Sequence, residues 1–212
     1  MFSVIFDMDG TLLDTQKPFI EAWNVCGEYQ GIKNMGNYVK FVLGMNDAGN
    51  KAYLRSQFPE LDYEKFRIDV RTYMLENMVV RYKKGAKDLL DFLKNHNVKM
   101  ALASGSTRGS IFHHLKEVDA EHYFDVILGS EDIENGKPAP DIFLNAAWLM
   151  GVEPKNCYVF EDSDNGIKAG FAAGMKSIGI EDMLPFKAEI RKMMFCELKD
   201  LGEAIEIFEN EL

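Results

Sequence analysis

The sequence has little cysteine and no long apolar run. Its three cysteines, Cys26, Cys157 and Cys196, are scattered over 212 residues and odd in number. They show neither the spacing of a metal site nor a disulfide framework, so we interpret them as buried free thiols in a reducing compartment. No apolar run approaches the roughly 18 residues of a membrane span, and the N-terminus begins a strand without the basic region of a signal peptide. These absences predict a cytoplasmic protein without a membrane partner.

Positive charge is also scarce. The 24 lysines and arginines are outnumbered by 34 aspartates and glutamates, and the formal net charge is −10. Such a balance argues against nucleic acid or an anionic membrane as the main partner. An acidic protein can still bind phosphate if a metal ion and a few basic residues make a local positive pocket. The sequence says little about assembly, and we expect a monomer.

The strongest local signal is a pair of carboxylates near the N-terminus. The apolar run Val4–Phe6 leads into Asp7 and Asp9, followed by Gly10 and Thr11. Residues two apart on a strand point the same way, so both acids should leave the strand end together. Two neighbouring carboxylates repel unless a cation or a shared proton relieves them. A solvated turn explains a bare Asp-x-Asp, but the longer pattern predicts a divalent-metal site with one acid to attack and one to carry a proton.

Apolar runs and helical patterns alternate along most of the chain. After the first strand we expect strands at 99–103, 124–128, 157–160 and 176–180, with helices at 86–95, 108–117, 140–150 and 165–173. Residues 16–81 instead show helical patterns and frequent aromatic residues. Continuous apolar strands separated by helices indicate a parallel sheet covered on both faces. We therefore predict an α/β fold, with a Rossmann-like core of 1–15 and 82–212 and an inserted all-helical cap domain of 16–81.

Polar residues follow several of these strands. Ser104-Gly105-Ser106 follows the second strand, Lys137 lies after the third, and Glu161-Asp162 ends the fourth. Taken singly, the serine suits a turn or a helix cap, the lysine a solvated loop and the two acids a helix cap. Ligands of open parallel sheets bind beyond the carboxyl ends of the strands. Together with the first two acids, these residues predict one convergent site.

Four segments match, in order, the motifs of a known superfamily. The matching residues are Asp7 with Asp9, Ser104, Lys137, and Glu161 with Asp162. This pattern resembles the haloacid dehalogenase-like hydrolases. The strings Gly-Lys-Pro-Ala-Pro-Asp-Ile-Phe and Phe-Glu-Asp-Ser-Asp-Asn-Gly-Ile-Lys-Ala-Gly are similar to the beta-phosphoglucomutase-like branch, whose small helical cap matches the insertion. The resemblance covers essentially the whole chain and is weakest in the cap.

The resemblance implies a Mg²⁺-dependent phosphatase for a small phosphorylated metabolite, in particular a sugar phosphate. Asp7 would be the nucleophile and a metal ligand, and Asp9 the general acid and base, with its backbone carbonyl on the metal. Asp162 would be a further ligand, and Glu161 either a ligand or a residue just outside the ligand set. The phosphoryl oxygens would be held by Ser104, Gly105 and Lys137.

Cap residues bear on the substrate. Arg67 and Arg71 lie one helical turn apart and could present one basic face, although pairing with Glu64 or Asp69 on a solvated face is the simpler interpretation. Phe19 and Trp23 fall in the first cap helix, where they could line the entrance. For Trp23, plain packing inside the cap is favoured.

Two cap positions separate a phosphatase from a sugar phosphomutase. The resembling mutases carry a histidine where this chain has Phe19. They also carry an arginine for the distal phosphate, and alignment on Gly44 places Asp47 there. A phenyl ring cannot shuttle a proton and an aspartate repels a second phosphate, so the phosphatase is favoured and the mutase is second. A non-catalytic phosphate-binding regulatory protein is a third hypothesis, which the complete set of catalytic positions disfavours.

Overall fold

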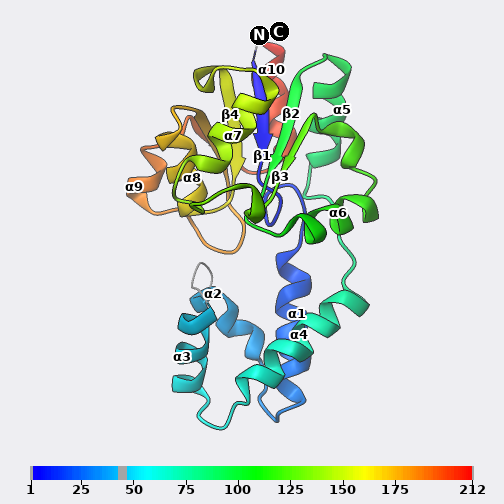
Figure 1. The fold of residues 1–212 in the computed structure, drawn as a ribbon, viewed down its shortest axis with the longest axis vertical. Coiled ribbons are helices and arrows are strands. Elements are labelled where there is room, and N and C mark those ends of the chain that lie inside the picture. The colour runs from blue at the N-terminus through cyan, green and yellow to red at the C-terminus, as the bar shows by residue number, and fades with distance from the viewer. Residues whose placement is uncertain (1, 43–46, 212) are drawn as a thin grey trace. The chain divides into compact units, whose positions relative to one another are not determined.

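The protein is built on one parallel sheet. The computed structural model describes residues 2–42 and 47–211. Within them the sheet has the order β3-β2-β1-β4-β5-β6, with every neighbouring pair parallel. The strands are β1 (Ser3–Phe6), β2 (Lys99–Ala103), β3 (Val126–Leu128), β4 (Cys157–Glu161), β5 (Lys176–Ile180) and β6 (Cys196–Leu198). This arrangement (Figure 1) confirms the predicted fold class.

The largest differences from the prediction concern two strands. β3 begins at Val126 rather than at residue 124, and just before it the Asp125 carboxylate accepts a hydrogen bond from the Met100 backbone N–H at 2.9 Å. β6 was not predicted. It has three residues at the sheet edge, and none of them is fully buried. A strand this short and this exposed leaves no apolar run in the sequence.

The four helices predicted after the strands are present, with bounds within one residue of the prediction: α5 (Ala86–Asn95), α6 (Arg108–Glu117), α7 (Asp141–Met150) and α8 (Asp164–Ala172). Two short helices, α9 (Ala188–Arg191) and α10 (Ala204–Glu209), were not predicted. Pro140 is the N-cap of α7 rather than its first residue. Gly151 and Gly174 follow α7 and α8 with φ of +68° and +72°, which is the left-handed conformation that glycine allows at a helix end. Shorter 3₁₀ turns lie at Met35–Tyr38, Glu121–Tyr123, Ser130–Asp132, Pro154–Asn156 and Leu201–Glu203.

Helices cover both faces of the sheet. Ile5, Ala101 and Val159 pack with buried residues of α7 and α8 on one face. On the other, the Phe208 ring of α10 meets the rings of Tyr158 and Phe160. Burying each large apolar side chain contributes roughly 1.5–3 kcal/mol, so both layers fix the ends of the strands in place.

The two chain ends lie together at one end of the sheet (Figure 1). Near the N-terminus, the Phe2 ring stacks on Phe208 of α10 with 4.7 Å between the ring centroids. This contact joins the start of β1 to the last helix, so residues from both ends of the sequence complete one layer of the core.

The chain divides into two compact units. One, which we call the sheet unit, comprises the residues up to Asp14 and from Val80 onward; the other, the helical insert, is Thr15–Val79. The insert contains α1 (Gln16–Glu28), α2 (Val39–Val42), α3 (Asp47–Gln57) and α4 (Tyr63–Asn77). Its own core includes Trp23 of α1, whose ring meets Phe66 of α4 edge-on with centroids 5.2 Å apart.

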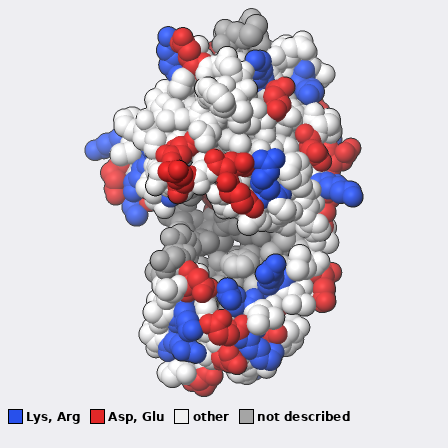
Figure 2. Space-filling model, in the orientation of Figure 1, with Lys and Arg blue, Asp and Glu red and all other residues white. Residues whose placement is uncertain are grey.

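Surface features agree with the composition. All three cysteines are free, but Cys196 is only partly buried, which corrects the expectation of three buried thiols. None of the helices that the structure describes is long and apolar enough to span a membrane. On the face drawn in Figure 2, acidic and basic side chains are interspersed on each unit rather than gathered into one basic patch.

Candidate active site

The candidate site lies where the strand order reverses. β1 is flanked by β2 and β4, so the chain crosses to one side of β1 first and to the other side later. Crevices at the carboxyl ends of such strands are the usual ligand sites of open α/β sheets. The sheet pairing continues past β1, since the Asp7 backbone N–H donates to the Phe160 carbonyl at 3.0 Å. The first acid is therefore held by β4 as well as by its own strand.

Lys137 joins two of the predicted acids. Its Nζ donates to Asp7 Oδ1 at 2.6 Å, to Glu161 Oε1 at 2.6 Å and to the Ala103 carbonyl at 3.1 Å. Burial alone would lower the pKa of Lys137, but the Asp7 and Glu161 carboxylates outweigh it and the pKa is raised. The lysine therefore stays charged and links the ends of β1, β2 and β4.

Glu161 is the most enclosed acid of the site, with 1% of its surface exposed. Its second oxygen, Oε2, accepts from the backbone N–H groups of Asp162 and Ser163 and from the Ser163 hydroxyl. A Cβ on Gly166 would lie 1.8 Å from the Glu161 carboxyl carbon, so the first turn of α8 leaves room only for glycine. Because both oxygens are in use, this carboxylate is better placed to anchor Lys137 than to offer a free oxygen to an ion.

Three carboxylates form a compact acidic cluster. In the described part of the chain, one oxygen each of Asp7, Glu161 and Asp162 lie within 4.8 Å of one another. Burial, followed by the charge of Glu161, raises the pKa of Asp162 to about 7. Burial is also the main cause that raises the pKa of Asp7 well above its ordinary value, against the opposing effect of Lys137. One ammonium cannot balance three carboxylates, and all the donors are oxygens, so the cluster can hold a hard divalent cation.

Asp9 faces a different part of the site. Its Oδ2 accepts from the Ser106 hydroxyl at 2.7 Å and, more weakly, from the Ser104 hydroxyl at 3.4 Å. Ser104 in turn accepts the backbone N–H of Ser106 at 3.0 Å. Gly10, with φ of +84°, makes the tight turn that follows. The Asp9 carboxylate thus lies against the loop after β2, whereas the Asp7 carboxylate faces Lys137. Two acids in such different surroundings can take different chemical roles.

Sequence comparison decides the family. The sequence pattern of the haloacid dehalogenase-like hydrolases matches residues 4–180. The chain belongs to this family. The match spans both units, and it confirms the predicted superfamily and the prediction of an enzyme of the phosphatase/hydrolase class.

Relatives lie in the same branch. A phosphorylated carbohydrates phosphatase of Thermotoga maritima is 30% identical over 181 residues, which are 84% of each chain. A beta-phosphoglucomutase of Bacillus subtilis is 33% identical over 193 residues, or 85% of this chain and 83% of that one. Among solved structures, a family hydrolase of Deinococcus radiodurans with bound phosphate and sodium has a TM-score of 0.84 at 24% identity, covering 100% of this chain and 96% of the other. The beta-phosphoglucomutase-like branch is therefore confirmed.

Predicted cap residues partly come together within the helical insert. The Asp47 carboxylate accepts a hydrogen bond from the Tyr63 hydroxyl at 2.8 Å and lies 3.8 Å from the Arg67 guanidinium. Arg67 also pairs with Glu64 at 3.6 Å, as the simpler interpretation of that residue expects. Burial and the hydrogen bond to Asp47 raise the pKa of Tyr63 to about 12. All this geometry belongs to α3 and α4 of the insert itself.

Other predicted cap residues stay apart from this group. Trp23 is 5% exposed and packs in the insert core, and the Phe19 ring lies 5.6 Å from it. Arg71 is exposed on α4. Gly44, on which the comparison with the mutases was aligned, lies outside the described residues. Trp23 is therefore a packing residue, as favoured.

Some contributors to the site were not among the residues to which the sequence assigned a role. Ser106 was part of the loop noted after β2, and its spacing of two from Ser104 could have indicated a paired role. Thr11 donates to Asp162 Oδ1 at 3.1 Å. Asp182, in the loop after β5, pairs with Lys83 at 2.5 Å, and its charge helps to raise the pKa of Asp162. No local pattern distinguishes Asp182 from any other loop acid.

Proposed function

We propose that this enzyme is a Mg²⁺-dependent phosphatase that hydrolyses a small phosphorylated metabolite through an aspartyl-phosphate. The observation that carries the proposal is Asp7, a buried carboxylate that lies within the acidic cluster and shares Lys137 with Glu161. An oxygen-only cluster suits Mg²⁺, with Asp7, Asp162 and the backbone carbonyl of Asp9 as its ligands. When bound there, the ion would supply positive charge beside the phosphoryl group.

In this mechanism Asp7 attacks phosphorus and the bond between phosphorus and the ester oxygen breaks. Asp9 gives its proton to the leaving oxygen, which departs as an alcohol, and then takes a proton from the water that attacks the aspartyl-phosphate. Orthophosphate and free Asp7 result. The phosphoryl oxygens would be held by Ser104, the backbone N–H of Gly105, and Lys137, which balances the charge as it moves between groups.

A sugar phosphate is the proposed substrate class. The support is the printed name of the Thermotoga maritima relative, a phosphorylated carbohydrates phosphatase. We also propose that the enzyme acts in the cytoplasm as a monomer, in keeping with its free cysteines and mixed surface charge.

A mutase is the second candidate, because a beta-phosphoglucomutase is 33% identical. Two residues of the insert argue against it. Phe19, whose ring packs beside Trp23, has no exchangeable proton. The Asp47 carboxylate is positioned by Tyr63 and Arg67. A carboxylate at this place would repel a second phosphate rather than bind it. A non-catalytic phosphate-binding protein is the third candidate.

A phosphate-release assay separates these candidates. The protein is incubated with sugar phosphates, nucleotides, glycerol phosphate and pyrophosphate, with Mg²⁺ and with a chelator, and the products are followed by ³¹P NMR. We expect Mg²⁺-dependent release of orthophosphate from a sugar phosphate and no release by Asp7→Asn. Conversion of a hexose 1-phosphate to its 6-phosphate without release would establish the mutase instead. Binding of phosphate without turnover of any substrate would establish the third candidate.

A further inference from the structure

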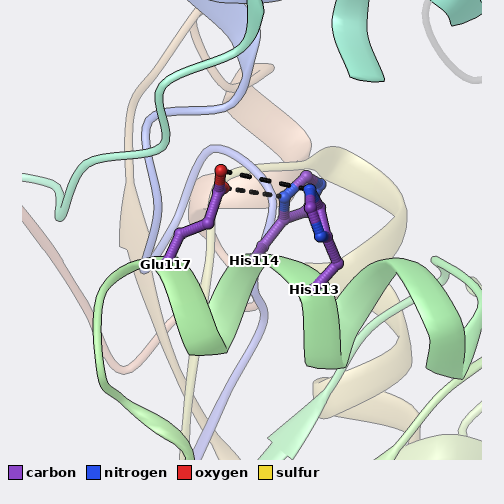
Figure 3. Close-up of side chains that lie close together, drawn as sticks. All are labelled: His113, His114 and Glu117. Atoms are coloured by element: carbon purple, nitrogen blue, oxygen red, sulfur yellow. Dashed lines mark ion pairs between the residues drawn. The ribbon is translucent and has the colours of Figure 1, made fainter. Parts of the chain in front are cut away.

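A second group of metal-binding side chains lies far along the chain from the acidic cluster. His113, His114 and Glu117 sit on the last turns of α6, and one ligand atom of each lies within 4.8 Å of the others. Figure 3 shows both imidazoles and the carboxylate on the same side of the helix. His114 and His113 precede Glu117 by three and four residues, and residues at these spacings are neighbours on the surface of a helix.

The distances bring the three groups close to a common point. His114 Nδ1 lies 3.6 Å from one Glu117 oxygen, and His113 Nε2 lies 4.0 Å from the other. The two imidazole rings are 5.4 Å apart between centroids. Ligand atoms around one tetrahedral ion, each about 2.0–2.2 Å from it, are a little over 3 Å from one another. Small side-chain rotations therefore suffice to close the group around an ion.

The state of His114 points to a ligand. Its side chain is 13% exposed, and within the described residues its buried Nδ1 atom has no hydrogen-bond partner. The other nitrogen, Nε2, lies 3.3 Å from the Ser110 hydroxyl. In the tautomer that donates Nε2–H to Ser110, the Nδ1 lone pair is directed toward the Glu117 carboxylate. A cation held between Nδ1 and that carboxylate would bind both groups.

Ser110 completes an arrangement common around bound metals. A histidine that binds a metal through one ring nitrogen usually donates a hydrogen bond from the other ring N–H to a nearby acceptor, which fixes the tautomer and the ring orientation. The donor set of two imidazoles and one carboxylate differs from the oxygen-only cluster at the strand ends, and it suits Zn²⁺ far better than Mg²⁺. Both histidines and the acid come from one helix, so the site needs no other part of the chain.

We propose that His113, His114 and Glu117 form a Zn²⁺ site on α6, with Ser110 as the residue that positions His114. The remaining coordination position is open to water. The site is separate from the catalytic cluster and does not depend on the proposed phosphatase activity. An ion there would stabilise the last turn of α6, the helix that follows the Ser104–Ser106 loop.

Calorimetric titration tests the proposal. Untagged protein is titrated with Zn²⁺ in excess Mg²⁺, so that the oxygen-only cluster is already filled. We expect one Zn²⁺ per chain for the wild type, at least about 100-fold weaker binding for His113→Ala and Glu117→Gln, and about tenfold weaker binding for Ser110→Ala. His113 and Glu117 are partly exposed, with 53% and 32% of their side chains accessible, so both variants should keep the wild-type circular dichroism.

His122→Ala is the matched control. His122 is similarly exposed, at 56%, and lies 4.0 Å from the Asp119 carboxylate, but no second histidine accompanies it. This variant should bind Zn²⁺ as the wild type does. Zn²⁺ should also raise the unfolding temperature of the wild type and of His122→Ala but not of His113→Ala. Equal isotherms for the wild type and His113→Ala would overturn the proposal and leave the three side chains as neighbours without a role in metal binding.

Discussion

The two units of the molecule each place a cation between two acids, and the two arrangements differ in burial. In the sheet unit, Lys137 lies 2.6 Å from Asp7 and from Glu161, and its side chain is 12% exposed. In the helical insert, Arg67 lies 3.8 Å from Asp47 and 3.6 Å from Glu64, and its side chain is 57% exposed. The sequence shows the same residue types in both places.

Burial decides how much each group of charges contributes to the free energy of unfolding. Exposed ion pairs contribute about 0–1 kcal/mol, because water and salt screen them. Removing one partner of a buried pair costs roughly 3–5 kcal/mol, because an uncompensated charge remains in a poorly hydrated place. The contrast teaches that the strand ends of the sheet unit hold buried charges whose loss is costly, whereas the face of α4 carries exposed charges that can change with little effect on the fold.

The largest effect is expected for Lys137→Met. The change leaves Asp7 and Glu161 in contact without their shared cation, so we expect a loss of kcat of about 10³-fold or more and a lower free energy of unfolding. Arg67→Met, the matched change in the insert, should alter the free energy of unfolding by less than about 1 kcal/mol. Phosphate release and urea unfolding measure both. Similar losses for the two variants would remove the distinction between the units.

Gly166→Ala should have the next largest effect. The added methyl group meets the Glu161 carboxylate at 1.8 Å, so the glutamate must move and Lys137 loses its anchor. We expect kcat to fall by about 10²-fold, with a clear loss of stability. Gly109→Ala is the control, since a Cβ there meets nothing within 4 Å and alanine favours the α6 helix by up to about 1 kcal/mol. Full activity of Gly166→Ala would show that the position of Glu161 is unimportant.

Metal and pH should act together on the stability of the sheet unit. The pKa of Asp162 is raised from 3.8 to about 7, so the folded, metal-free protein holds a proton there that the unfolded chain has released. The resulting stabilisation is complete below the unfolded pKa and is lost as the pH rises through about 7. Each pKa unit corresponds to about 1.4 kcal/mol.

Urea unfolding with a chelator should therefore show lower stability at about pH 8 than at about pH 5, and Asp162→Asn should flatten that slope. Added Mg²⁺ should stabilise the wild type more at the higher pH, where the carboxylates are ionised. A metal-free protein whose stability rises over this range would contradict the raised pKa of Asp162.

Ser106→Ala should produce a smaller, more specific defect. The Ser106 hydroxyl donates to Asp9 at 2.7 Å, and a typical intramolecular hydrogen bond contributes about 0.5–1.5 kcal/mol. We expect kcat to fall by about tenfold while KM changes little, because the role proposed for Asp9 is to transfer a proton and not to bind the substrate. Ser56→Ala, whose hydroxyl donates to a backbone carbonyl on the exposed face of α3, is the control and should be silent. An unchanged kcat for Ser106→Ala would remove this role.

Much of the sheet unit could be predicted because its signals are local. A buried strand is a continuous apolar run, and a helix end is marked by glycine at Gly151 or Gly174, so the order of elements and the rim residues Asp7, Ser104 and Glu161 follow from the sequence. β6 could not be predicted, because three half-exposed residues leave no pattern. The contacts of Ser106 with Asp9 and of Asp182 with Lys83 join residues about a hundred positions apart, and only the folded chain brings them together.

The smallest effect is expected in the insert, from Tyr63→Phe. Tyr63 donates its hydroxyl to Asp47 at 2.8 Å, and its ring stays buried in either variant, so the fold loses one partly exposed hydrogen bond. We expect the free energy of unfolding to fall by about 1 kcal/mol or less. If Asp47 helps to select the substrate, KM should change while kcat for the preferred sugar phosphate holds, because the residues proposed to carry out the chemical step all belong to the sheet unit. Asp62→Ala, at the N-cap of α4, is the control for a purely structural loss, and it should lower stability by about 0.5–2 kcal/mol without altering KM. A fall in kcat for Tyr63→Phe with KM unchanged would mean that the insert contributes to the chemical step, and the contrast between the two units would then fail.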